Sequence, residues 1–189
     1  LSLHDALPIS QACCDLLSHG QVELIITNYP NPPLFGLSIL TTLKPFRDVF
    51  LANRKFFPYP ETPLSLAELS TYPRLMLDRK SVSGQSLVHL FRQNQLELMP
   101  EIELNSNDLL VDLARIGLGI AYIPEYCVPT DDPDLYCIPM QNEIPERKIV
   151  TAYSEDSPLS AAAKRFLDLL KEQCDKADKI TPDTEGDLE

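Results

Sequence analysis

Small polar residues gather after three predicted strands, where an α/β protein could bind a ligand. They are Thr27 and Asn28 after the first strand, Ser83, Gly84 and Gln85 after the second, and Ser106 after the third. In open parallel α/β sheets, ligands bind beyond the carboxyl ends of the strands. The second and third groups also open predicted helices, whose first N–H groups attract anions, and a glycine there would let a ligand approach the backbone. The pattern predicts a site for a small anion, although serine at a helix start is also a common cap.

Residues that would indicate catalysis or metal binding form no recognisable pattern. The histidines outside the first nine residues, His19 and His89, have no serine or cysteine partner at a suggestive spacing. The motifs of hydrolases, P-loop NTPases and dinucleotide-binding enzymes are absent. The five cysteines form no CxxC pair, and their odd number favours a reducing, cytoplasmic compartment. We therefore predict no catalytic residue, no metal ligand and no cofactor.

The composition argues against two further functions for this chain taken alone. The 189 residues include 28 acidic and 16 basic side chains, which gives a formal net charge of −12. Nucleic-acid affinity comes largely from Lys and Arg that neutralise phosphates, so the chain by itself is a poor DNA or RNA binder. The sequence contains no run of about 18 apolar residues, the length that a membrane-spanning helix needs. The length suggests one domain or two small lobes.

The first nine residues, LSLHDALPI, resemble a technical artefact. The codons TCC CTA CAC GAC GCT CTT CCG ATC encode Ser2–Ile9, and this string resembles a common sequencing-library adapter. A signal peptide is a weaker explanation, because the segment has no cationic start and only a short apolar run. A genuine N-terminal loop stays open as an alternative. We expect natural coding sequence to begin near Ser10 and leave residues 1–9 out of any site.

Strands and helices alternate in the middle of the chain, which is typical of a parallel sheet covered by helices on both faces. The predicted strands are Val22–Thr27, Arg74–Leu77, Glu101–Leu104, Ile120–Ile123, Leu135–Met140 and Lys148–Tyr153. The predicted helices are one from Gln11 to the stop at Gly20, Thr62–Leu69 with Pro63 in its first turn, Ser83–Gln95, Asn107–Ile116, and Ser157–Gln173 capped by Ser157. Leu37–Asn53 is extended and interrupted at Pro45, and residues 175–189 form an acidic, disordered tail.

The segment Pro100–Val128 resembles the effector-binding domain of LysR-type transcriptional regulators. It reads PEIELNSNDLLVDLARIGLGIAYIPEYCV, and the family has there a strand, a capped helix, and a GLGIA-like turn and strand ending near proline. Supporting similarities occur at Gly20–Thr27, at Leu64–Leu69 followed by Pro73, and at Ser157–Leu170. The order and spacing of these segments carry the resemblance, which covers about Gln11–Gln173.

The resemblance implies a two-lobed α/β fold like that of type-2 periplasmic binding proteins, with mixed sheets flanked by helices and an incomplete first lobe. Residues 10–45 and 151–174 would form lobe one, and residues 46–150 lobe two. A small effector would bind between the lobes, touched by Thr27 from one lobe and by Ser83–Gln85 from the other. The family reads DNA through an N-terminal helix-turn-helix, so DNA would be a partner only through that missing domain. The intact protein would be a cytoplasmic homo-oligomer.

Two other classes of function remain open on this scaffold. A periplasmic solute-binding protein has the same fold, although the GLGIA-type segment and the free cysteines favour the regulator. An enzyme is less favoured because no nucleophile–base pair is apparent, yet fold alone does not decide function. The coding sequence upstream of Ser10 would separate the three, since each predicts a different segment there.

Overall fold

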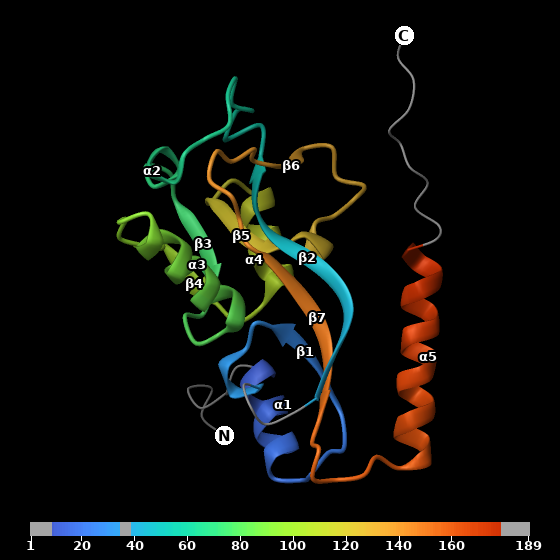
Figure 1. Ribbon diagram of the computed structural model, residues 1–189. Coiled ribbons are helices and arrows are strands. Elements are labelled where there is room, and N and C mark those ends of the chain that lie inside the picture. The colour runs from blue at the N-terminus through green and yellow to red at the C-terminus, as the bar shows by residue number, and fades with distance from the viewer. Residues whose placement is uncertain (1–8, 35–38, 179–189) are drawn as a thin grey trace. The chain divides into compact units, whose positions relative to one another are not determined.

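The computed structural model describes residues 9–34 and 39–178, which fall into two compact units (Figure 1). Unit 1 is built on Phe46–Arg147, whereas unit 2 contains residues 13–45 and the chain from Lys148 onward. Strands β2 (Ile39–Asn53) and β7 (Glu146–Tyr153) each continue from one unit into the other. The lobe boundaries predicted from the sequence stay a prediction, and the contacts place the second division after Arg147.

The sheet of unit 1 is mixed. Strand β3 (Arg74–Leu77) pairs in parallel with both β4 (Ile102–Leu104) and β5 (Ile120–Pro124), as the strand–helix alternation predicted. Strand β2 pairs antiparallel with β5 and with β6 (Leu135–Cys137), which makes the sheet mixed. The predicted α/β class with a mixed sheet flanked by helices is therefore confirmed.

Helices cover both faces of this sheet, and the strand period of two decides which residue faces which helix. Phe50 and Ala52 belong to the core on the face covered by α2 (Leu66–Leu69) and α3 (Val82–Gln93). Leu51, which lies between them, packs on the opposite face against α4 (Asn107–Arg115). Figure 1 shows α3 and α4 on either side of the strands. A strand buried on both faces needs a continuous apolar run, which β2 supplies only over residues 49–52.

Unit 2 packs α1 (Ile9–Ser18) against β1 (Ile25–Tyr29) and β7. Strands β1 and β7 pair antiparallel, with Thr27 opposite Val150. The core contains Cys14, Leu17 and Ile25 among its buried members. Gly20, at a φ of 65°, ends the turn after α1, as predicted from the left-handed backbone that glycine tolerates. The unit also contains α5 (Ala161–Asp178).

Several predicted boundaries differ from the structure, and three of them have a clear physical reason. Strand β2 runs through Pro45 without a break, because one proline removes a donor but still adopts an extended φ. Helix α2 begins after Ser65, whose hydroxyl forms a capping box with Glu68, so Pro63 lies outside its first turn. Helix α5 begins at Ala161, because the hydroxyl of Ser160 caps it by accepting the Ala163 N–H at 3.2 Å.

The disordered tail predicted from Asp175 is wrong for residues 175–178, which continue α5 to Asp178. Residues 179–189 lie outside the described part of the chain, as do residues 1–8 of the adapter-like segment. Ile9, the last residue of that segment, is the first residue of α1. Polar composition alone did not reveal that the helix extends beyond its apolar stripe.

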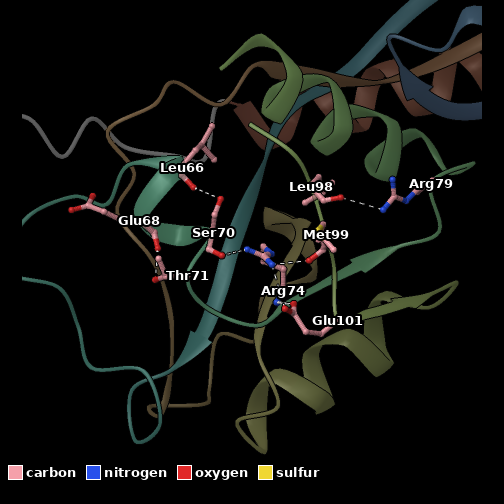
Figure 2. A network of polar contacts seen from close by, with 9 residues as sticks. All are labelled: Leu66, Glu68, Ser70, Thr71, Arg74, Arg79, Leu98, Met99 and Glu101. Carbon is pink, nitrogen blue, oxygen red and sulfur yellow. Dashed lines mark hydrogen bonds and ion pairs between the residues drawn. The ribbon is translucent and has the colours of Figure 1, made fainter. Parts of the chain in front are cut away.

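A buried arginine fixes the corner between α2, β3 and the segment that leads into β4 (Figure 2). Arg74 is 7% exposed, and its guanidinium donates to the carbonyl oxygens of Ser70 and Met99, the latter at 2.7 Å. The same group lies 3.3 Å from the carboxylate of Glu101. One side chain therefore satisfies backbone acceptors from two segments far apart in sequence.

We expect Arg74→Met to lower the free energy of unfolding by about 2 kcal/mol, because two carbonyl oxygens lose their donor while the apolar volume is kept. Urea titration would measure the change. Arg79→Met is the matched control, since Arg79 is half exposed and pairs with Glu103 at 2.8 Å. The control should change stability by no more than about 1 kcal/mol. Equal effects of the two substitutions would contradict a stabilising role for Arg74.

Candidate functional site

The start of α3 is positioned by Ser81, two residues before the predicted start of the helix at Ser83. The Ser81 hydroxyl accepts the Gly84 N–H at 2.9 Å, and its carbonyl accepts the Gln85 N–H at 2.9 Å. These two N–H groups, which we predicted to face a ligand, are therefore used inside the helix. The N–H groups of Val82 and Ser83 are the ones left without an intrahelical acceptor.

Gly84 serves the chain itself at this corner. A Cβ atom at Gly84 would lie 2.3 Å from the carbonyl oxygen of Asp78 and 2.8 Å from that of Leu77. The missing side chain therefore lets α3 approach the end of β3, and the close approach of a ligand is not needed to explain the glycine. Gln85 is exposed, and its amide folds back to donate to the Lys80 carbonyl at 3.1 Å.

Ser83 lies in a buried cluster of charged groups that the sequence analysis did not identify. Its hydroxyl accepts from Nη1 of Arg147 at 2.8 Å and lies 3.5 Å from Oδ1 of Asp48. Nη1 of Arg147 also donates to Oδ2 of Asp48 at 2.6 Å. Asp48 and Arg147 are 1% and 2% exposed, so the ion pair is removed from water. The cluster brings together β2, α3 and β7.

Burial dominates the electrostatics of this cluster. It raises the pKa of Asp48, and the nearby Arg147 guanidinium offsets only part of that rise. Burial also raises the pKa of Tyr122 on β5, and the Asp48 carboxylate adds to the effect. The Cys127 thiol, in the short 3₁₀ helix Glu125–Cys127, has a raised pKa through burial and through the carboxylates of Asp108 and Asp48. A raised thiol pKa makes Cys127 a weak nucleophile.

One edge of the Arg147 guanidinium has no acceptor. Nε and Nη2 are buried and find no hydrogen-bond partner within residues 9–34 and 39–178. These two nitrogens hold three of the five N–H donors of an arginine. The opposite end, Nη1, is engaged by Asp48 and Ser83, and the Phe46 ring lies with its centroid 5.0 Å from the guanidinium carbon. The group is thus held at one end and free to donate at the other.

The remaining predicted site residues lie outside this cluster. Ser106 caps α4, since its hydroxyl accepts the Leu109 N–H at 3.3 Å. Asp108 places a carboxylate in the first turn of that helix, so the start of α4 is a poorer anion site than the start of α3. Thr27 and Asn28 belong to β1 of unit 2, where the Thr27 hydroxyl is buried and has no partner among the described residues.

The sequence held a weak signal for the missed residues. Asp48 interrupts the apolar part of β2, and Arg147 lies near the start of the β7 strand. Taken alone, each charged residue predicts a solvent-exposed position on a strand. Their pairing became visible only with the fold, because the two residues are 99 positions apart.

The described residues show neither a metal site nor a membrane span. No group of three or more His, Cys, Asp or Glu side chains within them could hold a metal ion. Likewise, none of the helices in residues 9–34 and 39–178 combines the length and apolar character needed to cross a bilayer.

Comparison with protein-family models gives a match over residues 8–175, to the model described as LysR substrate binding domain. A curated relative, the HTH-type transcriptional activator CmpR of Synechocystis sp. (strain ATCC 27184 / PCC 6803 / Kazusa), is 25% identical over 124 residues. The matched region is 65% of this chain and 41% of CmpR, so the chain spans well under two thirds of that relative's length.

Solved structures share the fold at low sequence identity. The regulatory domain of CcmR from Synechocystis PCC6803, in complex with 2-PG, has a TM-score of 0.77 and 17% identity, over 87% of this chain and 79% of that chain. The bromide-bound regulatory domain of HypT from Salmonella typhimurium has a TM-score of 0.70 and 19% identity, over 89% and 79%. At these identities the likeness concerns the fold.

Proposed function

The chain belongs to the family of LysR substrate-binding domains, and from that premise we propose that it is the effector-sensing part of a transcriptional regulator. DNA would be read by a helix-turn-helix outside this chain, as the name of the relative CmpR suggests for that protein. The net charge of −12 fits a segment that does not itself bind DNA. The intact regulator would be a cytoplasmic homo-oligomer without catalytic activity. Family membership disfavours the alternative of a periplasmic solute-binding protein.

The effector is a small anion whose acid group binds at the start of α3. The observation that carries this proposal is the position of Ser83, which joins a helix N-terminus to the buried Asp48–Arg147 pair. A helix start offers unpaired N–H groups and a partial positive charge. Solved relatives in fold hold 2-PG in one case and a bromide ion in another, which supports a small ligand.

The site residues predicted from the sequence take different roles in this proposal. Ser83 contributes a hydroxyl and an N–H group, whereas Gly84 and Gln85 shape the turn that presents them. Ser106, Thr27 and Asn28 are retained as further contacts to the effector. Mutagenesis of each is the direct test.

We expect Ser83→Ala to weaken effector binding roughly tenfold or more, which corresponds to one lost hydrogen bond to a charged group. Calorimetric titration with a panel of small carboxylates, phosphorylated acids, 2-PG and bromide would identify the ligand and measure the change. Ser65→Ala, at the cap of α2, is the control and should leave the affinity unchanged.

Ser83→Ala should also lower stability by about 1 kcal/mol, because Arg147 loses a buried acceptor. Affinities are therefore compared well below the melting temperature. An effector bound equally well by the Ser83→Ala variant would refute this site. A neutral or cationic effector that depends on Ser83 would refute only the anion class.

A further inference from the structure

Arg147 has the geometry of a carboxylate receptor with one edge that lacks an acceptor among the described residues. Its Nη1 atom is held by Oδ2 of Asp48 at 2.6 Å and by the Ser83 hydroxyl at 2.8 Å. Its Nε and Nη2 atoms are buried and unpartnered within the described residues. A buried donor without an acceptor is costly, so this edge favours any anion that can reach it. Nε and Nη2 together form the fork that binds a planar carboxylate through two parallel hydrogen bonds.

The start of α3 adds a second attraction at the same place. Ser83 is the second helical residue of a 12-residue helix, and its side chain touches Arg147 directly. The partial positive charge of the helix start and the full positive charge of the guanidinium therefore lie in the same region. The ion pair with Asp48 is electrically neutral, so a second carboxylate would leave an unbalanced negative charge in a buried place.

We propose that Arg147 recognises the acid group of the effector through its free Nε–Nη2 edge, and that Asp48 takes up a proton when the anion binds. This inference rests on the proposed function: Arg147 would recognise the effector at that site, and the protonation of Asp48 would make its binding depend on pH. Two carboxylates on one guanidinium repel each other, and protonation of Asp48 removes the repulsion. The groups that face Asp48 are Arg147 from β7, Ser83 from α3, Tyr122 from β5 and Cys127 from the following 3₁₀ helix. Arg147 is the cation among them.

The sign of the pH dependence follows from the pKa of Asp48. Burial already raises this pKa in the free protein, and a bound anion raises it further. Between the two values the complex holds more protons than the free protein. The affinity therefore rises as the pH falls through the pKa of the complex, and levels off below the pKa of the free protein.

Nitrate is a suitable probe because it is small and planar and stays ionised throughout this range. Nε and Nη2 are covered by protein atoms, so a small anion has the best access. Titration of the 189-residue chain at several pH values and constant ionic strength, followed by the NMR signals of the Ser83 N–H and the Arg147 Nε–H, gives the affinity. We expect it to increase by up to tenfold per pH unit as the pH is lowered through the window.

Two variants separate the parts of the proposal. Arg147→Lys keeps the charge but removes the fork, and should weaken nitrate binding roughly tenfold or more. Asp48→Asn should bind nitrate more tightly at neutral pH and lose the pH dependence. The controls are Arg115→Lys and Asp132→Asn, which alter an arginine–carboxylate pair that is far more exposed, at 2.9 Å. Both controls should behave as the wild type.

A pH-independent affinity in the wild type, or a dependence that persists in Asp48→Asn, overturns the proposal. Should Arg147→Lys fail to fold, the wild-type pH profile still decides. An effector that depends on Ser83 but binds equally well to a folded Arg147→Lys variant leaves the proposed function standing and refutes this inference. If neither nitrate nor any member of the effector panel binds, both fail.

Discussion

Arg147→Met is expected to lower the free energy of unfolding by roughly 3–5 kcal/mol, because it leaves the Asp48 carboxylate buried without its counterion. Both side chains are almost completely buried, and the pair is joined at 2.6 Å. Methionine keeps most of the aliphatic volume against Phe46, so the lost stability measures the effect of leaving the Asp48 charge unpaired. Urea titration at neutral pH would measure it.

The same variant should become less stable, relative to the wild type, as the pH rises. Arg147 is the main group that opposes the burial that raises the pKa of Asp48, so without it the folded chain binds a proton there more tightly than the unfolded chain. A group that binds more protons in the folded state loses stability with increasing pH above its unfolded pKa. A loss that does not vary with pH would contradict the assignment of the effect to Asp48.

A double variant tests whether the loss comes from an unpaired charge or from damaged packing. Arg147→Met combined with Asp48→Leu removes both charges and should recover much of the stability, since buried ion pairs can often be replaced by apolar groups. Arg115→Met is the matched control at the much more exposed Arg115–Asp132 pair, and should cost no more than about 1 kcal/mol. A double variant as unstable as Arg147→Met alone would show that packing dominates.

Gly84→Ala is expected to lower the free energy of unfolding by about 3 kcal/mol, at the upper end of the usual cost of overpacking. The new Cβ would lie 2.3 Å from the Asp78 carbonyl oxygen, which is backbone and cannot rotate away. The start of α3 must then move away from the end of β3. Because Ser83 precedes Gly84, effector affinity should fall together with stability.

Gln85→Ala provides the comparison for Gly84→Ala on the same helical turn. Gln85 is exposed and its amide donates to the nearby Lys80 carbonyl, so the change in stability should stay within about 0.5 kcal/mol. Urea titration and calorimetry of both variants would measure stability and affinity side by side. A Gly84→Ala variant with wild-type stability would show that α3 can shift freely.

Local patterns predicted the order of the elements well. The helical spacing of Leu87, Leu90 and Phe91 predicted the buried face of α3, and all three are buried. The alternation of strand and helix predicted the parallel pairing of β3 with β4 and β5. These features depend on residues within one turn or one pleat of each other, so the sequence alone contains them.

Helix starts were harder to predict, because several hydroxyl residues compete at each of them. Ser81 rather than Ser83 caps α3, and Ser160 rather than Ser157 caps α5. A serine can cap from any of these positions, and packing of the helix against its unit decides which one does. The choice at α3 matters for the proposed site, since it leaves the Ser83 hydroxyl available to Arg147.

Sequence patterns were sufficient to predict the class of fold and the family, whereas an anion site at the polar start of α3 stays a prediction. Only the tertiary structure paired Asp48 with Arg147 across 99 residues and left one edge of the guanidinium free. The physical reason is burial. Removing two charges from water makes each depend on the other, and no local pattern records which distant charge the fold will bring to it.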